Sequence, residues 1–133
     1  MQLYVVSTTR TNNFIDEQIM TKIKTVWEEA SQHFGQHQNC TKYGVYYDYE
    51  SDYKGDYSLG IAIEERCGES VITIPESEKY EVFKVDISSE HGIINAWKKI
   101  WGQAETGELK RAYTYDFEKY YANGEVEIHI AIK

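Results

Sequence analysis

The chain has few of the residues that mark secreted or metal-binding proteins. Its 133 residues include one proline and two cysteines, Cys40 and Cys67, which lie far apart and have no ligand cluster around them. We therefore expect free thiols rather than a disulfide framework or a metal pair. His33 and His37 stand four residues apart, but no third ligand is close in the sequence. No metal site is predicted.

Long apolar runs and clustered basic residues are also lacking. No stretch approaches the length needed to span a membrane, and residues 1–7 lack the basic region and apolar run of a signal peptide. We therefore expect a cytoplasmic protein without membrane contact. The 14 Lys and Arg are outnumbered by 22 Asp and Glu, and the net charge is −8. This balance argues against direct nucleic-acid binding and favours cationic or neutral partners.

Signatures of cofactor-dependent or nucleophilic catalysis do not occur either. The sequence contains no glycine-rich phosphate loop, no nucleophile elbow and no paired cysteine and histidine of the catalytic type. No cofactor is predicted, and the chain is more typical of a binding protein than of an enzyme.

Tyrosine and tryptophan, in contrast, are abundant. The 12 tyrosines are more than a small core can bury with every hydroxyl paired, so some should line a cleft or the surface. Most single cases still have an ordinary interpretation, since strand tyrosines usually pack across strands and helix tryptophans usually belong to the core. One carboxylate, Glu118, is surrounded in sequence by five rings: Tyr113, Tyr115, Phe117, Tyr120 and Tyr121. Partial desolvation among rings would favour a cationic partner for this acid.

The pattern of aromatic and acidic residues occurs twice. Residues 47–53 match residues 115–121, and this alignment places Glu50 opposite Glu118. A glycine and an apolar alternation follow in both places, at residues 55–63 and 124–132. We interpret this as an internal duplication within one domain, residues 1–133. The copies are residues 1–64 and 79–133, and residues 65–78 connect them.

Periodicity predicts the same order of elements in both copies. Strands are expected at residues 3–8, 43–49 and 57–63, then at 80–87, 111–121 and 125–132, with a short strand at 71–74 in the connection. Helices are expected at residues 14–34 and from a serine cap at Ser88 or Ser89 to Gly102. A half-sheet with one helix leaves an apolar edge and face uncovered. We therefore predict an α+β fold in which duplicated strand–helix–strand–strand units form one antiparallel sheet with both helices on one face.

Four segments resemble the GyrI-like small-molecule-binding domain, which is also the effector-binding half of AraC- and MerR-type transcription regulators. They are YGVYYDYESD at residues 43–52, YEVF at 80–83, WKKI at 97–100 and DFEKY at 116–120. They occur in the right order over nearly the whole chain. The resemblance implies a groove between the two helices that takes hydrophobic aromatic, often cationic, molecules. It also implies that Glu118 is the counter-charge for such a ligand.

The resemblance further implies which aromatic residues line the groove. Trp97, Tyr80 and a strand tyrosine, Tyr46 or Tyr47, fall at the expected positions. We expect Trp97 to be partly accessible, whereas Trp27 should belong mainly to the core. We expect no DNA-binding domain beside this one, so the resemblance does not imply direct control of transcription.

Three functions stay open on the sequence alone. The favoured one is a stand-alone binding protein for hydrophobic, aromatic and cationic compounds, of the kind found in multidrug-binding regulators. A second is a hydrolase in which Glu118 acts as general base and Tyr46 orients the substrate. The third is a protein-binding module, for which the family name points to DNA gyrase as the partner.

Overall fold

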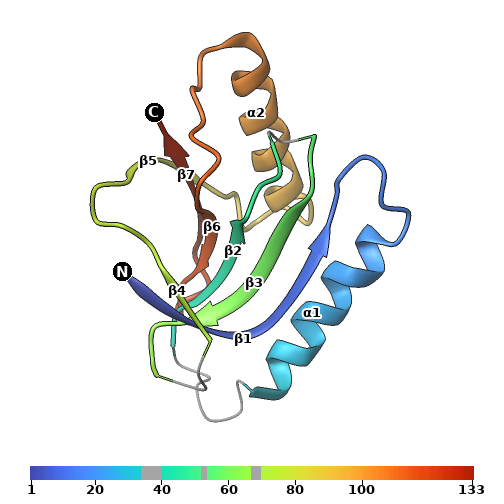
Figure 1. Cartoon of the computed structure of the whole chain (residues 1–133), viewed down its shortest axis with the longest axis vertical. Coiled ribbons are helices and arrows are strands. Elements are labelled where there is room, and N and C mark those ends of the chain that lie inside the picture. Colours follow the sequence, from blue (N-terminus) through green and yellow to red (C-terminus); the bar gives the residue numbers. More distant parts are fainter. Residues whose placement is uncertain (34–39, 52–53, 67–69) are drawn as a thin grey trace.

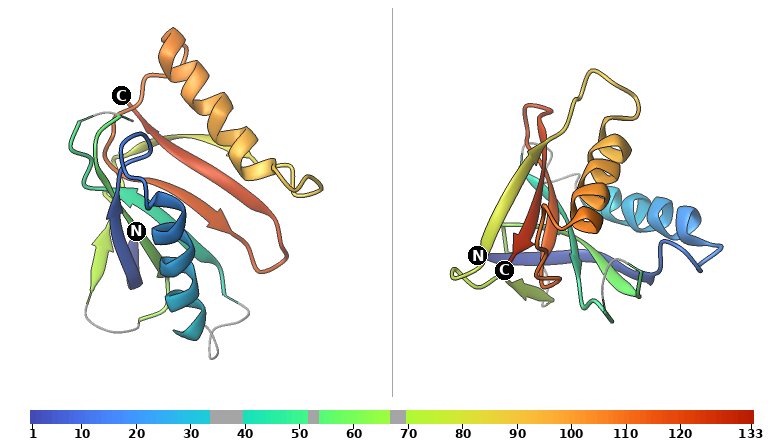
Figure 2. Two further views of the ribbon diagram at one scale, coloured as in Figure 1. Left: turned by 90° about the vertical axis from the view of Figure 1, so that its right-hand side faces the viewer. Right: turned by 90° about the horizontal axis from the view of Figure 1, so that it is seen from above.

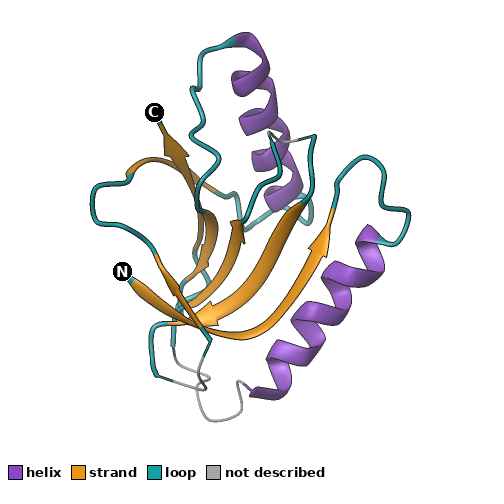
Figure 3. Cartoon of the chain, viewed as in Figure 1, coloured by secondary structure: helices purple, strands orange, loops and turns teal. Residues whose placement is uncertain are grey.

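The computed structural model describes residues 1–33, 40–51, 54–66 and 70–133, and in them seven strands form one antiparallel sheet (Figures 1 and 3). Both helices lie on the same side of this sheet (Figure 2). In chain order the elements are β1 (Gln2–Thr11), α1 (Ile19–His33), β2 (Lys42–Tyr47), β3 (Tyr57–Ile63), β4 (Val71–Thr73), β5 (Lys79–Lys84), α2 (Gly92–Thr106), β6 (Asp116–Tyr120) and β7 (Val126–Ile132).

The strand order β4-β1-β3-β2-β6-β7-β5 divides the sheet at its centre. On one side lie β1, β3 and β2, and on the other lie their counterparts β5, β7 and β6 in mirrored order. Each half reads strand–helix–strand–strand, and β4 belongs to the connection. The predicted α+β fold is therefore confirmed, while the exact bounds of the two copies stay a prediction.

The pairing of β2 with β6 decides which side chains face the helices. Gly44 lies opposite Glu118, and Val45 lies opposite Phe117. Directly opposed residues share a face of the sheet, and successive residues of a strand alternate between faces. Glu118 therefore faces the helices, whereas Val45 and Phe117 face the other way.

Apolar side chains fill both faces of the sheet. Under α1, Val26 and Ala30 pack on Leu59, Ile61 and Ile63. A second cluster lies under α2 and contains Trp97, Ile100, Ile128 and Ile130. The opposite face carries a third cluster, with members Leu3, Tyr43, Val45, Ala62, Ile72, Ile74 and Phe117.

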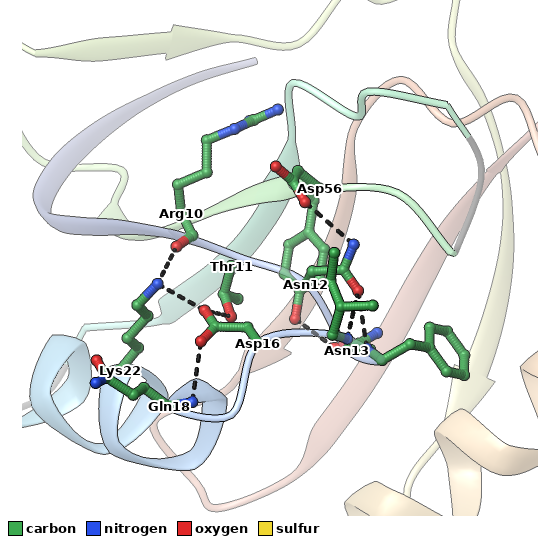
Figure 4. Close-up of polar contacts among 11 residues, drawn as sticks. Arg10, Thr11, Asn12, Asn13, Asp16, Gln18, Lys22 and Asp56 are labelled. Atoms are coloured by element: carbon green, nitrogen blue, oxygen red, sulfur yellow. Dashed lines mark hydrogen bonds and ion pairs between the residues drawn. The ribbon is translucent and has the colours of Figure 1, made fainter.

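The first helix begins later than predicted, at Ile19 rather than residue 14. Asn12 accepts the backbone N–H groups of Phe14 and Ile15 at its Oδ1, at 2.8 and 3.2 Å, and so holds them in a turn (Figure 4). Asp16 does the same for Gln18 at 2.9 Å. Side chains that bond nearby amides compete with helix formation. The apolar period was misleading here because Phe14 and Ile15 are exposed.

Three other predicted boundaries were wrong, namely both ends of the second helix and the start of β6. The second helix continues through Gly102 to Thr106, and Gly107, at φ 83°, ends it in the left-handed conformation that glycine adopts at little cost. Its start has no side-chain cap, so neither predicted serine serves there. Strand β6 begins at Asp116 rather than residue 111. Tyr113, at φ 56°, interrupts the extended backbone before it.

The alignment of Glu50 with Glu118 does not hold in three dimensions. Glu50 follows the end of β2 in a bend and is exposed, whereas Glu118 lies in the middle of β6 and is buried. The match of local sequence was real, but strand pairing places the two segments differently. Glu50 is therefore not the structural counterpart of Glu118.

Asp116 fastens the start of β6 to its neighbours. The carboxylate is fully buried and accepts the Ala131 N–H at 2.7 Å, the Arg111 Nη2 at 2.7 Å and the Tyr49 hydroxyl. Its partners come from three separate segments of the chain, so the carboxylate links all three.

We expect Asp116→Ala to lower the free energy of unfolding by roughly 3–5 kcal/mol, because the change leaves the buried guanidinium of Arg111 without its counter-charge. Urea denaturation followed by circular dichroism measures this. Glu50→Ala, at an exposed acid, is the control and should change stability little. A loss of similar size in both variants would contradict the linking role of Asp116.

Candidate functional site

A cavity of about 340 Å³ lies between the two helices, with the sheet as its floor. This volume is near the lower end of the range of small-molecule sites. The helices contribute mainly apolar side chains, among them Met20, Ile23, Trp27, Ile93, Trp97 and Trp101. Tyr46, Glu118 and Tyr120 come from the sheet. The groove expected from the resemblance is thus present as a cavity walled by both helices.

Glu118 is the buried acid of this cavity, with 4% of its surface exposed. Its Oε2 accepts the Trp97 Nε1–H at 2.7 Å and the Tyr46 hydroxyl at 3.0 Å. Its Oε1 accepts the Tyr120 hydroxyl at 2.8 Å. The carboxylate is therefore held by three uncharged donors from α2, β2 and β6.

The electrostatic state of Glu118 differs from that of Asp116, two residues earlier on the same strand. Arg111 pairs with Asp116, but among the described residues no basic side chain forms an ion pair with Glu118. Burial raises the pKa of Glu118 above its ordinary value, and the three hydrogen bonds oppose that rise without cancelling it. In the part of the chain that the structure describes, the donors that stabilise a negative charge at this position are all neutral.

Aromatic rings enclose the carboxylate. Tyr46 meets Trp97 edge to face, with ring centroids 5.1 Å apart and planes at 70°. Trp27 and Tyr120 meet at 5.1 Å and 80°. Because the hydroxyls of Tyr46 and Tyr120 are directed at Glu118, their rings rather than their polar ends are left to form the wall.

Gly44 makes room for this arrangement. A Cβ atom at this position would lie 3.2 Å from Oε1 of Glu118 and 3.3 Å from the Trp27 ring, closer than most such contacts. The absent side chain thus lets the carboxylate and the indole share the space above β2. Sequence reasoning missed this residue because only the pairing of β2 with β6 reveals what lies opposite it.

The structure brings together three of the five residues predicted to bind a ligand. Glu118, Trp97 and Tyr46 all line the cavity. Tyr47 and Tyr80 pack instead against the cluster on the opposite face of the sheet. Tyr47 follows Tyr46 directly, so alternation along β2 turns it away from the helices. The Tyr80 hydroxyl donates to the Tyr115 carbonyl oxygen at 2.9 Å.

The burial predicted for two tryptophans was wrong. Trp97 is 8% exposed and Trp27 is half-buried, the reverse of the expectation. The hydrogen bond from the Trp97 indole to Glu118 holds that ring against the sheet. Both rings line the cavity, so Trp27 belongs to the site and is not only part of the core.

Several further cavity residues were missed by sequence reasoning: Asn13, Tyr49, Tyr57 and Arg111. Tyr57 donates its hydroxyl to Asn13 Oδ1 at 2.6 Å, and Tyr49 donates to Asp116. These contacts join positions far apart in the chain, so local sequence gave no signal for them.

Two further findings concern metal binding and membrane-spanning helices. Within the described ranges, no group of three or more His, Cys, Asp or Glu side chains could hold a metal ion. His37 and Cys67 lie outside those ranges, so the predictions made for them stay predictions. None of the helices described is both long and apolar enough to cross a membrane.

The pKa of Glu118 leads to a prediction about stability. Because this pKa is raised in the folded state, ionisation of Glu118 costs stability at neutral pH. The cost fades as the pH falls through the folded pKa and is absent below the ordinary value of 4.5. We expect Glu118→Gln to raise the Tm at neutral pH and to have little effect below 4.5. Thermal melts across this pH range measure the difference.

Glu50→Gln, at an exposed acid, should leave the Tm unchanged throughout that range. An equal gain for Glu118→Gln at every pH would show that packing rather than ionisation is responsible.

Comparison with known proteins places this geometry in a family. The family model Cass2, described as integron-associated effector binding protein, matches residues 4–132. The crystal structure of the integron cassette protein VCH_CASS2, from the mobile metagenome of Vibrio cholerae, is similar at a TM-score of 0.78 with 26% sequence identity. That match covers 100% of this chain and 90% of the other. No curated protein matches.

These matches confirm the GyrI-like effector-binding fold that the sequence motifs implied. Because the family model spans nearly the whole chain, the chain belongs to the Cass2 family of integron-associated effector binding proteins.

Proposed function

We propose that the protein binds hydrophobic aromatic cations in the cavity between α1 and α2, with Glu118 as counter-charge. Membership of an effector-binding family supports a small-molecule ligand in general. The proposal of a cationic ligand rests on the surroundings of Glu118. This buried carboxylate lies at the cavity wall and accepts hydrogen bonds from neutral donors, but it has no ion-pair partner among the described residues.

A cation would supply what this carboxylate lacks. Opposite charges a few ångströms apart attract more strongly in a buried site than in water, because the surroundings screen them less. The rings of Trp27, Trp97 and Tyr46 add attraction, since aromatic faces are negative and hold cations. A flat apolar body is favoured as well, because it can fill the space between two helices lined by apolar side chains.

The contacts of Glu118 favour binding over hydrolysis. A general base must accept a proton from a water molecule, and Glu118 already uses three of the roughly four lone-pair positions of its carboxylate for hydrogen bonds from Trp97, Tyr46 and Tyr120. Tyr46, to which the hydrolase hypothesis gave the role of orienting substrate, donates its hydroxyl to Glu118 instead. Ligand capture needs neither group to move.

The isosteric pair 1-methylquinolinium and 1-methylnaphthalene separates the contribution of charge from that of shape. Glu118→Gln keeps the size of the side chain and removes its charge. We expect the variant to bind the cation about five- to a hundred-fold more weakly while its affinity for the neutral probe changes little. Quenching of tryptophan fluorescence can measure both affinities, because all three tryptophans line the cavity.

The matched control is Glu50→Gln, which removes one negative charge from an exposed position. It should bind both probes as the parent does. Equal loss of cation affinity in the two variants would indicate a general effect of net charge and would contradict the proposal. If Glu118→Gln bound the cation normally but lost hydrolysis of an aryl ester, the hydrolase function would replace it.

A further inference from the structure

We propose that the mouth of the cavity, formed by Met20, Ile93 and Ile94, binds an aliphatic chain on the ligand. The inference rests on the proposed function and narrows its ligand class to amphiphilic aromatic cations. Such a ligand enters the cavity with its charged end first. The charge then lies beside Glu118, and the chain lies across the mouth.

The exposure of the lining residues identifies the mouth. Of the described residues that line the cavity, Met20, Ile93 and Ile94 are exposed, at 75%, 37% and 42%, whereas Glu118 is only 4% exposed. Met20 lies in the first turn of α1, and both isoleucines lie in the first turn of α2. Further along α2, Trp97 is buried and bonds the acid. The cavity therefore opens to solvent at the beginnings of the two helices, and the carboxylate lies at its buried end.

All three side chains of the mouth are apolar and none carries a ring. Single exposed apolar residues are common, but a group of them at the opening of a ligand cavity marks a contact surface. A polar substituent of the ligand would give up water there without gaining a strong hydrogen bond. An aliphatic chain would instead remove its own surface and that of the three side chains from water. Met20 is flexible and can adapt to chains of different shape.

The two ends of the cavity fix the direction of the ligand. The carboxylate of Glu118 attracts the charged end, and the mouth favours the chain. The reversed ligand would place its chain against the buried carboxylate and leave that charge without a counter-charge, which is unfavourable. We therefore infer that the ligand carries its charge and its chain at opposite ends of an aromatic ring.

Two isomeric probes test this direction. 4-Hexyl-1-methylquinolinium carries its chain opposite the charged nitrogen, and 1-hexyl-4-methylquinolinium carries it on that nitrogen. The isomers have the same atoms and the same charge, so a general preference for apolar compounds cannot separate them. We expect the 4-hexyl isomer to bind about ten-fold more tightly, because only this isomer can place its charge and its chain at both ends of the cavity. Isothermal titration calorimetry measures both affinities.

The length of the chain gives a second measurement, with 1,4-dimethylquinolinium as the reference probe. A methylene group that leaves water completely strengthens binding about four-fold. One side of a chain at the mouth stays in water, so we expect about two-fold for each methylene group. The five methylene groups that 4-hexyl-1-methylquinolinium adds should therefore strengthen binding about thirty-fold in all.

Variants of the mouth locate this gain. Glutamine forms helices well and is polar, so Met20→Gln combined with Ile94→Gln removes apolar contact while keeping both helices. The gain from the hexyl chain should fall from about thirty-fold to less than about ten-fold. Val82→Gln is the control and should keep the parent's gain. Val82 is 48% exposed but lies on β5, outside the residues described as lining the cavity.

The two methionines of the chain, Met1 and Met20, report directly where the hexyl chain lies. We expect a nuclear Overhauser effect between the end of the chain of 4-hexyl-1-methylquinolinium and the ¹³C-labelled methyl group of Met20. Met1 is the internal control, since it is 40% exposed but does not line the cavity, and its methyl group should show no such effect. An effect from the chain end to the Trp97 indole N–H would show a reversed ligand and overturn this inference.

The remaining outcomes separate this inference from the proposed function. Equal affinity of the two isomers would overturn the inference, and the proposed function would stand if 1,4-dimethylquinolinium still bound Glu118→Gln more weakly than the parent. If 1,4-dimethylquinolinium bound both proteins equally, the proposed function and the inference would fall together. A dimer in analytical ultracentrifugation that dissociates in Met20→Gln would show that a second copy covers the mouth, and would also overturn the inference.

Discussion

The burial of Glu118, which has no ion-pair partner among the described residues, governs the arrangement of this protein's cavity. Three neutral donors hold Glu118, and they come from β2, β6 and α2, so the sheet and the second helix must be in place before the site exists. The pairing of β2 with β6 is equally necessary, because it sets Gly44 against the acid and leaves room for the Trp27 ring. The three hydrogen bonds thus offset part of the cost of burying the Glu118 carboxylate.

Two acids on one strand have different surroundings. Asp116 forms an ion pair with Arg111 and accepts a hydrogen bond from the Ala131 N–H on β7, so it holds these two segments together. Glu118 faces the same side two residues later and has no such partner within the described ranges. The difference lies in the neighbours and not in the strand, because both side chains are buried to a similar degree. Which of the two carboxylates pairs with an arginine could not be read from composition or charge.

The spacing of apolar residues along the sequence was sufficient to predict the order of strands and helices but not the residues of the site. Alternating apolar residues located β3 at residues 57–63, as observed, and the order of elements followed from the same pattern. The site depends on which of two adjacent residues faces the helices, and a tyrosine doublet such as Tyr46 and Tyr47 does not reveal it. Strand register settles that choice through contacts between residues about seventy positions apart. The late start of α1 also escaped prediction, because side-chain bonds of Asn12 replaced helical ones.

The cavity lies across the centre of the sheet, so a molecule bound in it would contact both halves of the chain. One wall comes from α1, in the first half of the chain, and the other from α2, in the second half. Among the described strands, β2 and β6 are the pair that joins the two halves of the sheet. A molecule bound between the helices would contact both halves of the chain and would therefore oppose their separation at the pairing of β2 with β6. Any ligand that fits adds its binding free energy to the stability of the native state.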